Sequence, residues 1–155
     1  MRRARRRNDD RGASLVELAL IAPVMALIVM GVLDLSRAYR MQIRLENAAR
    51  EGAAYAEKDP NRVGCAGTDD IPGRVISEDP SIASLPSFGV TVWTDTEGYR
   101  DFAVKITGCG GSLGDPDDRI RVDVKAKFDV ITPMVERIVG NTIDVTGSAI
   151  VEAQG

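Results

Sequence analysis

The chain has 155 residues, which is room for about one compact domain, and its net charge of −3 is unevenly distributed. Residues 1–12 hold six arginines and two aspartates, and the remainder, with 14 basic and 21 acidic residues, carries a net charge of −7. This acidic remainder argues against nucleic acid as a partner, because phosphate binding needs a basic surface. The chain has no histidine, which removes the commonest general base and metal ligand and every serine–histidine or cysteine–histidine nucleophile pair. We therefore expect no enzyme activity, no metal or other cofactor and no small-molecule substrate.

An apolar run at residues 13–33 (ASLVELALIAPVMALIVMGVL) contains one charged residue, Glu17. As a helix it would be about 31 Å long, close to the thickness of roughly 30 Å of a bilayer core. A core helix of a soluble protein rarely stays apolar on all sides for this length. Pro23 agrees with this interpretation, since a single proline is tolerated in spanning helices. The basic residues before the run predict a cytoplasmic N-terminus, and hence a C-terminal domain in the periplasm or at the cell surface.

A cleaved secretory signal is the alternative to a permanent anchor. Such a signal has an apolar stretch of about 7–15 residues and a small-x-small cleavage site at its far end. The run in this chain is longer, and residues 32–35 (VLDL) contain no such site. We therefore expect the helix to remain as a single membrane span.

Glu17 lies at the start of the span, where an unpaired carboxylate costs on the order of a few kcal/mol. It follows Gly12 by five residues. If the chain were cut between Gly12 and Ala13, the new amine of Ala13 would lie about one helical turn from Glu17. A charged amine is a natural ion-pair partner for a carboxylate in a medium of low dielectric. The amine could belong to the same chain or to a neighbouring subunit, and the second arrangement would set the register between packed helices.

The arginine-rich leader, Gly12, Ala13, Glu17 and the apolar run together resemble a type IV prepilin signal, which a prepilin peptidase cuts. Residues 11–56 resemble the TadE-like family of pilus-biogenesis proteins in particular. The segments that carry the resemblance are Arg11-Gly12-Ala13, Val16-Glu17, Pro23, Gly31, Asp34 and residues 48–53 (AAREGA). Many members have an aromatic residue after the glutamate, where this chain has Leu18.

The TadE-like family is similar to minor pilins or pseudopilins of the tight-adherence (Tad, Flp-type) pilus. The resemblance implies a processing site at Gly12 and Ala13 and an assembly role for Glu17. It implies three partners: the cell membrane, a prepilin peptidase, and other pilins or pseudopilins of the Tad machinery. On this interpretation the protein is a minor pilin or pseudopilin of Tad pilus assembly, placed in the membrane or in the pilus itself.

Residues 34–57 predict an amphipathic helix that continues the span outward. Small and apolar side chains recur at intervals of three or four residues, at Ala38, Met41, Leu45, Ala48, Gly52 and Ala56. We expect this face to pack on the outer domain. A second use, compatible with the first, is close packing of the small residues against other subunits.

The outer domain is expected to be rich in β-structure. Residues 58–87 predict a loop with one short helix near residues 71–76. Alternating, β-branched segments predict four strands, at residues 88–94, 102–107, 120–130 and 142–151. A helix or long turn at residues 133–139 and a turn at Gly140-Asn141 should join the last two. The expected fold class is α+β, with a long N-terminal helix, transmembrane and then amphipathic, packed on a small antiparallel β-sheet.

This division gives four parts of the chain: a basic leader (1–12), a transmembrane helix (13–33), a juxtamembrane helix (34–57) and an extracytoplasmic β-rich domain (58–155). Cys65 and Cys109 lie in the last part, outside the cytoplasm, where a disulfide can form. We expect them to be paired, which would add roughly 4 kcal/mol by the chain-entropy estimate. Two separate free cysteines are the alternative.

Two short patterns resemble catalytic or metal sites without their required context. Residues 110–114 (GGSLG) match the G-x-S-x-G nucleophile elbow, but Asp115-Pro116 follows where the elbow needs a helix, and no histidine is present. The aspartates of residues 115–118 and 69–70 do not have the spacing of a calcium-binding loop. A turn and solvated acidic loops are the preferred interpretations.

Two other functions are alternatives to the minor pilin. The protein could be an uncleaved, single-span membrane scaffold of a secretion or surface complex, in which case Glu17 should be dispensable. It could also be a membrane-tethered hydrolase or ligand-binding module, which the missing histidines and the absence of converging acidic residues disfavour.

Overall fold

A computed structural model of the chain describes residues 3–59, 62–63, 69–95, 102, 104–106 and 119–153. The helices and strands, in chain order, are α1 (Arg3–Lys58), α2 (Ile71–Glu78), the 3-10 helix η1 (Pro80–Ser84), β1 (Gly89–Thr94), β2 (Val104–Ile106), β3 (Arg119–Asp129), α3 (Pro133–Val139) and β4 (Thr142–Glu152). The fold class is α+β, as the sequence predicted.

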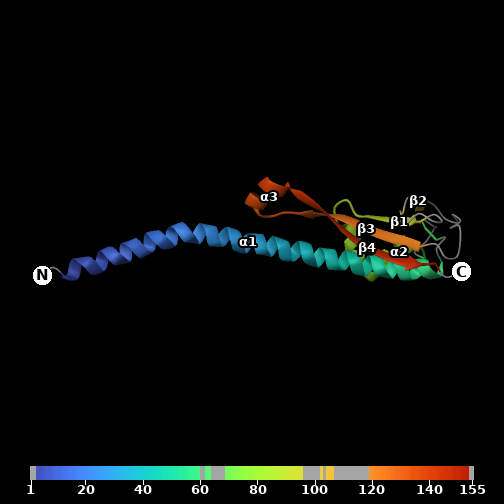
Figure 1. The fold of residues 1–155 in the computed structure, drawn as a ribbon, viewed down its shortest axis with the longest axis horizontal. Coiled ribbons are helices and arrows are strands. Elements are labelled where there is room, and N and C mark those ends of the chain that lie inside the picture. Colours follow the sequence, from blue (N-terminus) through green and yellow to red (C-terminus); the bar gives the residue numbers. More distant parts are fainter. Residues whose placement is uncertain are drawn as a thin grey trace.

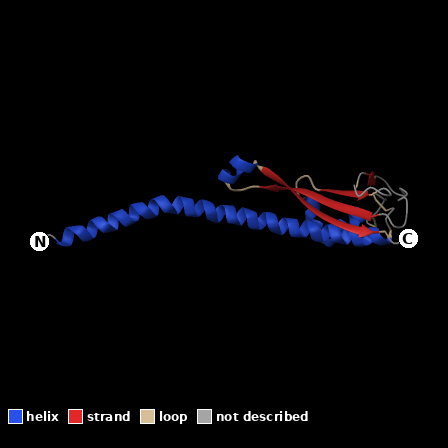
Figure 2. Cartoon of the chain, in the orientation of Figure 1, coloured by secondary structure: helices blue, strands red, loops and turns tan. Residues whose placement is uncertain are grey.

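Helix α1 is one continuous rod, and it covers the predicted leader, span and juxtamembrane helix without interruption. Its N-terminal half projects away from the rest of the molecule, and the sheet lies along its C-terminal half (Figures 1 and 2). The rod bends in its blue N-terminal part (Figure 1), and Pro23 lies inside the helix. A proline is a common cause of such a bend, because it removes one backbone hydrogen bond and its ring crowds the preceding turn. The helix ends two residues before Pro60, as expected.

The four strands form one antiparallel sheet in the order β2-β1-β3-β4. The central strand, β3, pairs along its length with β4, so that Val122 lies opposite Ala149, and on its other edge with β1, where Val122 lies opposite Val92. Three of the strands match their predictions to within a residue or two. Among the described residues β2 is shorter than predicted, at Val104–Ile106.

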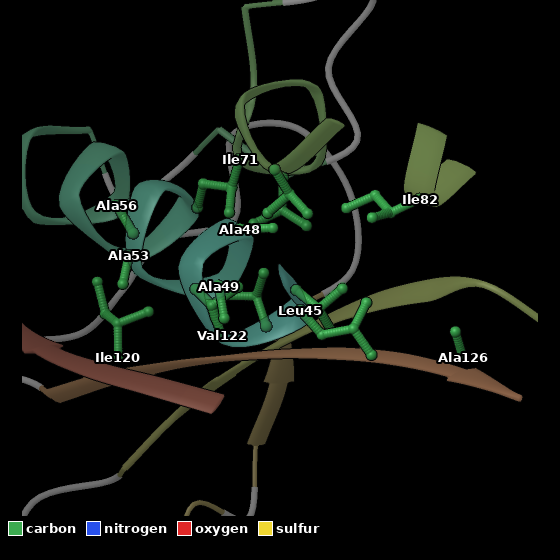
Figure 3. Packing of buried hydrophobic residues seen from close by; sticks show 14 of the residues in the cluster. Leu45, Ala48, Ala49, Ala53, Ala56, Ile71, Ile82, Ile120, Val122 and Ala126 are labelled. Atoms are coloured by element: carbon green, nitrogen blue, oxygen red, sulfur yellow. The ribbon is translucent and has the colours of Figure 1, made fainter. Parts of the chain in front are cut away.

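The core is formed where α1 passes between helix α2 and the sheet (Figure 3). The inner face of β3 is buried at the alternating positions that the sequence predicted: Ile120, Val122, Val124, Ala126 and Phe128. On α1 the predicted stripe is buried from Met41 to Ala56, with Ala38 partly buried. The packing of this face on the outer domain is therefore confirmed. Ala49 and Ala53, which the predicted stripe leaves out, are buried as well, on the side of α1 that faces Val122 and Ile120 of β3 (Figure 3). Helix α2 covers a second side of α1, where Ile71 and Val75 lie against Gly52.

Two short helices between α1 and β1 have side-chain caps at their N-termini. The Asp70 carboxylate accepts a hydrogen bond from the backbone N–H of Gly73 at 2.7 Å, which starts α2. Asp79 accepts one from the N–H of Ser81 at 3.1 Å, which starts η1. The first helix was predicted, whereas η1 lies in a segment that was predicted to be loop.

Strands β3 and β4 are joined through α3, at the end of the sheet nearest the N-terminal half of α1 (Figure 1). Both α3 and the turn after it were predicted. Gly140, in the turn, has a φ of 89°, which a glycine adopts without steric cost. Its N–H donates to the Glu136 carbonyl at 2.8 Å and closes the helix. The β3–β4 hairpin, with α3 at its tip, extends beyond the sheet toward the N-terminal half of α1 (Figure 1).

Candidate functional site

The predicted processing and assembly residues lie on the part of α1 that projects from the outer domain. Gly12, Ala13 and Glu17 are all exposed, and the peptide bond between Gly12 and Ala13 lies inside the continuous helix. The apolar segment that follows is not buried against any described part of the chain, and its large side chains, such as Leu20 and Met25, are open. By length and composition, α1 is a candidate membrane span.

Several predicted features lie outside the described residues. These are the Cys65–Cys109 disulfide, the GGSLG segment and the aspartates of residues 115–118. The described residues contain no group of three or more cysteine, aspartate or glutamate side chains arranged to hold a metal ion. The remaining acidic pair has protein partners, since Asp70 caps α2 and Asp69 accepts hydrogen bonds from Tyr55 and Arg62.

The end of the apolar run is joined to the outer domain by Asp34. Its carboxylate is only 8% exposed and accepts a hydrogen bond from the backbone N–H of Thr132 at 2.8 Å, across 98 residues of sequence. Arg37, one turn further along α1, contacts the second oxygen at 3.3 Å. The hydrogen bonds from Thr132, from its side chain first and then its backbone, hold the pKa of Asp34 below its usual value. The sequence marked Asp34 as the limit of the apolar run but gave no sign of its partner.

A basic groove of about 500 Å³ lies beyond this contact, between α1 and the sheet. Its lining residues are Arg37, Arg40, Met41, Arg44, Leu85 and Phe128. The Arg37 guanidinium lies over the Phe128 ring, 5.2 Å from its centre. The face of the ring attracts the positive charge of the guanidinium and helps to hold it in place. Arg40 donates to the Ser36 carbonyl of its own helix, and no described carboxylate pairs with it.

Arg44, at the far end of the groove, joins α1 to η1. Its Nε donates to the Asp79 carboxylate at 2.6 Å, and its Nη2 donates to the Ser81 hydroxyl. The Arg44 hydrogen bond, followed by that of Ser81, lowers the pKa of Asp79 to about 2. This ion pair stabilises the placement of the 3-10 helix against α1.

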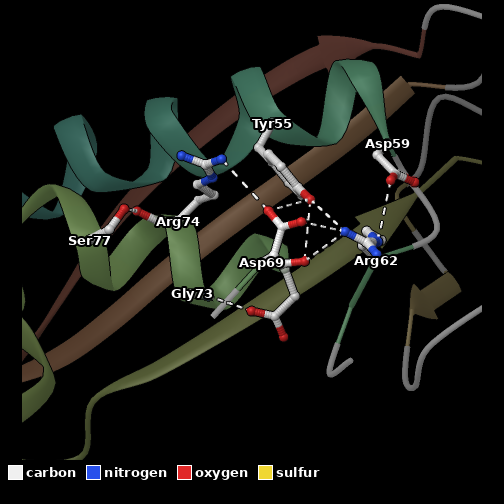
Figure 4. Close-up of polar contacts among 8 residues, drawn as sticks. Tyr55, Asp59, Arg62, Asp69, Gly73, Arg74 and Ser77 are labelled. Carbon is white, nitrogen blue, oxygen red and sulfur yellow. Dashed lines mark hydrogen bonds and ion pairs between the residues drawn. The ribbon is translucent and has the colours of Figure 1, made fainter. Parts of the chain in front are cut away.

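A second polar cluster pins the C-terminal end of α1 to the segment before α2 (Figure 4). The Tyr55 hydroxyl donates to Asp69, whose carboxylate also receives the Arg62 guanidinium at 2.6 Å. Arg74 lies over the Tyr55 ring, 5.1 Å from its centre. The hydrogen bond from Tyr55, with Arg62 next, holds the pKa of Asp69 below its usual value. Because Asp69 is paired with both Arg62 and Tyr55, the cluster fixes the two segments together.

Comparison with known proteins finds one family match, and it lies within α1. Residues 12–54 match the family model described as TadE-like protein. No curated protein and no solved structure matches the chain. The matched region begins at Gly12, contains the whole apolar run and ends before the outer domain. The chain is therefore similar to the TadE-like family over residues 12–54, a helical region that contains its apolar N-terminal segment.

Proposed function

We propose that this protein is a minor pilin or pseudopilin that acts in the assembly of a Tad (Flp-type) pilus. The observation that carries the proposal is the coincidence of the family match with an unburied apolar helix. The matched residues 12–54 contain a 21-residue apolar segment that the outer domain leaves bare. A bare helix of this length needs a membrane or neighbouring helices around it.

The proposed topology follows from charge. Residues 1–12, with their six arginines, lie in the cytoplasm, residues 13–33 cross the membrane, and residues 34–155 lie outside. Helix α1 then carries the outer domain on its extracytoplasmic half, where the amphipathic face from Met41 to Ala56 is already covered. The partners are the membrane, a prepilin peptidase and other pilins or pseudopilins of the machinery. The role requires no substrate chemistry.

Processing would convert the leader-bearing helix into an assembly-competent one. In the proposed mechanism a prepilin peptidase cuts between Gly12 and Ala13, and Ala13 becomes the first residue of α1. Glu17 then lies within about one turn of a helix N-terminus, where both the new amine and the helix dipole favour a negative charge. Its exposed carboxylate is open to the amine of a neighbouring subunit as well as to its own.

The test is the N-terminus of the membrane-extracted protein, measured by intact mass and terminal sequencing with and without the matching peptidase. The proposal expects a chain that begins at Ala13 only when the peptidase is present. A bulky Gly12→Val variant should remain uncut, whereas Glu17→Ala, five residues beyond, should be cut normally. A start beyond Leu33 would instead identify residues 13–33 as a cleaved signal.

An uncleaved membrane scaffold is the second candidate, and one observation favours it. Helix α1 runs without a break from Arg3 through the Gly12–Ala13 bond, so cutting requires that bond to leave its helical conformation. A chain that begins at Met1 in the presence of active peptidase would support the scaffold and contradict the pilin mechanism. In that case Glu17→Ala should leave function intact.

A further inference from the structure

We propose that the tip of the β3–β4 hairpin, residues 131–139, inserts into the outer headgroup layer of the bilayer that α1 crosses. This segment, called here the α3 tip, consists of α3 and the two residues before it. The inference rests on the proposed membrane span and goes beyond it, because it gives the outer domain a second contact with the lipid surface. Four observations carry it.

The first observation is the level of the tip along α1. Asp34 directly follows the apolar run, and its carboxylate holds the backbone N–H of Thr132 at 2.8 Å. If residues 13–33 fill the hydrocarbon core, Asp34 lies at its outer boundary, and Thr132 lies there with it. The headgroup layer adds about 5–7 Å on each side of the core. A segment that starts at this level is therefore within the headgroup layer.

The second observation is the exposure of large apolar side chains on the tip. Ile131 is 65% exposed and Ile138 is 80% exposed. Single exposed apolar residues are common on protein surfaces. These two, however, belong to the α3 tip, at the end of the outer domain nearest the bare apolar half of α1 (Figure 1). The apolar surface of the tip thus continues that of the proposed span across the Asp34–Thr132 contact.

The third observation is that α3 has a polar side opposite its apolar one. At 3.6 residues per turn, Val135 and Ile138 lie roughly 60° apart around the helix axis, and Glu136 and Arg137 flank the opposite side. The polar side faces a hollow of about 320 Å³ lined by Pro133, Glu136, Arg137 and Asn141. A short helix with this division suits the interface, where one side meets acyl chains and the other stays hydrated.

The fourth observation is the distribution of cations near the tip. Arg37 and Arg40 follow Asp34 within two turns of α1, and Arg137 lies on α3 itself. The Asp34 carboxylate that holds Thr132 is buried. The described residues around the tip therefore present the guanidinium groups together with the carboxylates of Glu136 and, at the base of the hairpin, Asp129 and Asp144. Arginines at this depth match the phosphates of lipid headgroups, which accept charge-assisted hydrogen bonds. The occupant that fits both the apolar and the cationic parts is the lipid surface.

Tryptophan fluorescence in vesicles tests the proposal in the full chain. The single native tryptophan is replaced in a Trp93→Phe background, and one new tryptophan is placed at Met25, at Ile138 or at Ile150. Met25 reports the span and Ile138 the tip. Ile150 is a matched control, because it is an exposed isoleucine on β4 near the opposite end of the hairpin. The vesicles contain phosphatidylcholine and phosphatidylglycerol, with bromine on the acyl chains either near the headgroup or near the chain ends.

The proposal expects Ile138→Trp to be blue-shifted and quenched most by the shallow bromines, and Met25→Trp to be quenched most by the deep ones. Ile150→Trp should be quenched by neither. If Met25→Trp is quenched and Ile138→Trp is not, this inference fails while the span stands. If Met25→Trp is not quenched, the membrane assignment itself fails. A blue shift at position 138 without quenching would show that protein, for example a second copy, covers the tip and would overturn the inference.

If the Trp93→Phe chain does not fold, the inference can still be tested. The same three substitutions are then made in the native chain, and the signal of the unsubstituted protein, which comes from Trp93 alone, is subtracted. Circular dichroism and the unfolding midpoint of each variant show which chains are folded. Position 138 should again lose emission to the shallow bromines, and an unchanged signal there would overturn the inference.

Discussion

Gly147 on β4 lies against the backbone of Leu45 on α1, so closely that no side chain fits between them. A β carbon added at Gly147 would overlap the Leu45 carbonyl carbon and the Glu46 nitrogen and would lie 2.5 Å from the Leu45 oxygen. These are backbone atoms of a helix and cannot rotate away. This close approach of the helix to the sheet therefore depends on a residue without a side chain.

Replacing Gly147 by alanine should destabilise the outer domain by about 3 kcal/mol, because the helix and β4 must separate to admit the methyl group. The measurement is urea unfolding of the detergent-solubilised chain, followed by Trp93 fluorescence. Gly89→Ala is the matched control in the same sheet, since a β carbon there meets nothing within 4 Å. Equal midpoints for the two variants would contradict the close approach.

The Asp34–Thr132 contact gives a local prediction. Asp34→Ala removes the acceptor of the Thr132 N–H and should free the hairpin end, while the sheet, whose core lies further along α1, stays folded. We expect amide exchange in residues 131–139 to become faster, on the order of tenfold, because a buried donor loses its partner. Hydrogen exchange with mass spectrometry measures it.

Asp34→Asn is the control for the same position. It keeps a side-chain oxygen of similar placement, so it should preserve most of the protection of residues 131–139. The midpoint of global unfolding should change little in either variant. Loss of the whole sheet's protection in Asp34→Ala would show that the contact supports the domain as a whole and would contradict a local role.

The Arg44–Asp79 pair predicts a dependence of stability on acid pH. The folded-state pKa of Asp79 is lowered from 3.8 to about 2, so the pair contributes stability that is present above pH 4 and is lost as the pH falls toward 2. Because both side chains are partly exposed, we expect a contribution of about 1 kcal/mol after solvent screening. The free energy of unfolding, measured between pH 5 and pH 2, should therefore fall less steeply in Arg44→Gln than in the unsubstituted chain.

Arg40→Gln is the matched control for this pH dependence. Arg40 lies one turn earlier on α1 and lines the same groove, but no described carboxylate pairs with it. Its substitution should leave the slope of stability against pH unchanged. An Arg44→Gln chain that keeps the full slope would show that other acidic groups account for the loss of stability in acid.

Much of the architecture was predictable because it follows from local periodicity. The alternation from Ile120 to Phe128 defined both the strand β3 and its buried face, and the small-residue stripe of α1 defined the face that packs. That stripe was too narrow, since Ala49 and Ala53 are also buried. The reason is that α1 is covered from two sides, by the sheet over Ala49 and Ala53 and by α2 over Gly52, and a single sequence does not show how many layers an element will contact.

The contacts that join distant segments were not predictable. Gly147 against Leu45, and Asp34 with Thr132, each link positions about a hundred residues apart, and no local pattern encodes such a pairing. The 3-10 helix η1 is different, because the Asp79-Pro80 sequence is a typical helix start and could have indicated it. In the candidate site, the prepilin-like motif identified Gly12, Ala13 and Glu17. Their roles remain predictions, because processing depends on a prepilin peptidase and assembly depends on neighbouring subunits.

The role of Glu17 is testable by separating charge from size. If its carboxylate pairs with the amine of Ala13 on a neighbouring subunit, Glu17→Ala and Glu17→Gln should both be processed normally and both assemble poorly, because each leaves the buried amine without its anionic partner. The measurements are the N-terminal mass of the membrane form and the amount of the protein that co-purifies with the other pilins. Glu51→Gln is the control, since it removes an exposed charge from the same helix beyond the span. Normal assembly of Glu17→Gln would show that the charge is not used and would favour the uncleaved scaffold. Failure of processing in both Glu17 variants would place the residue in recognition by the peptidase rather than in packing between subunits.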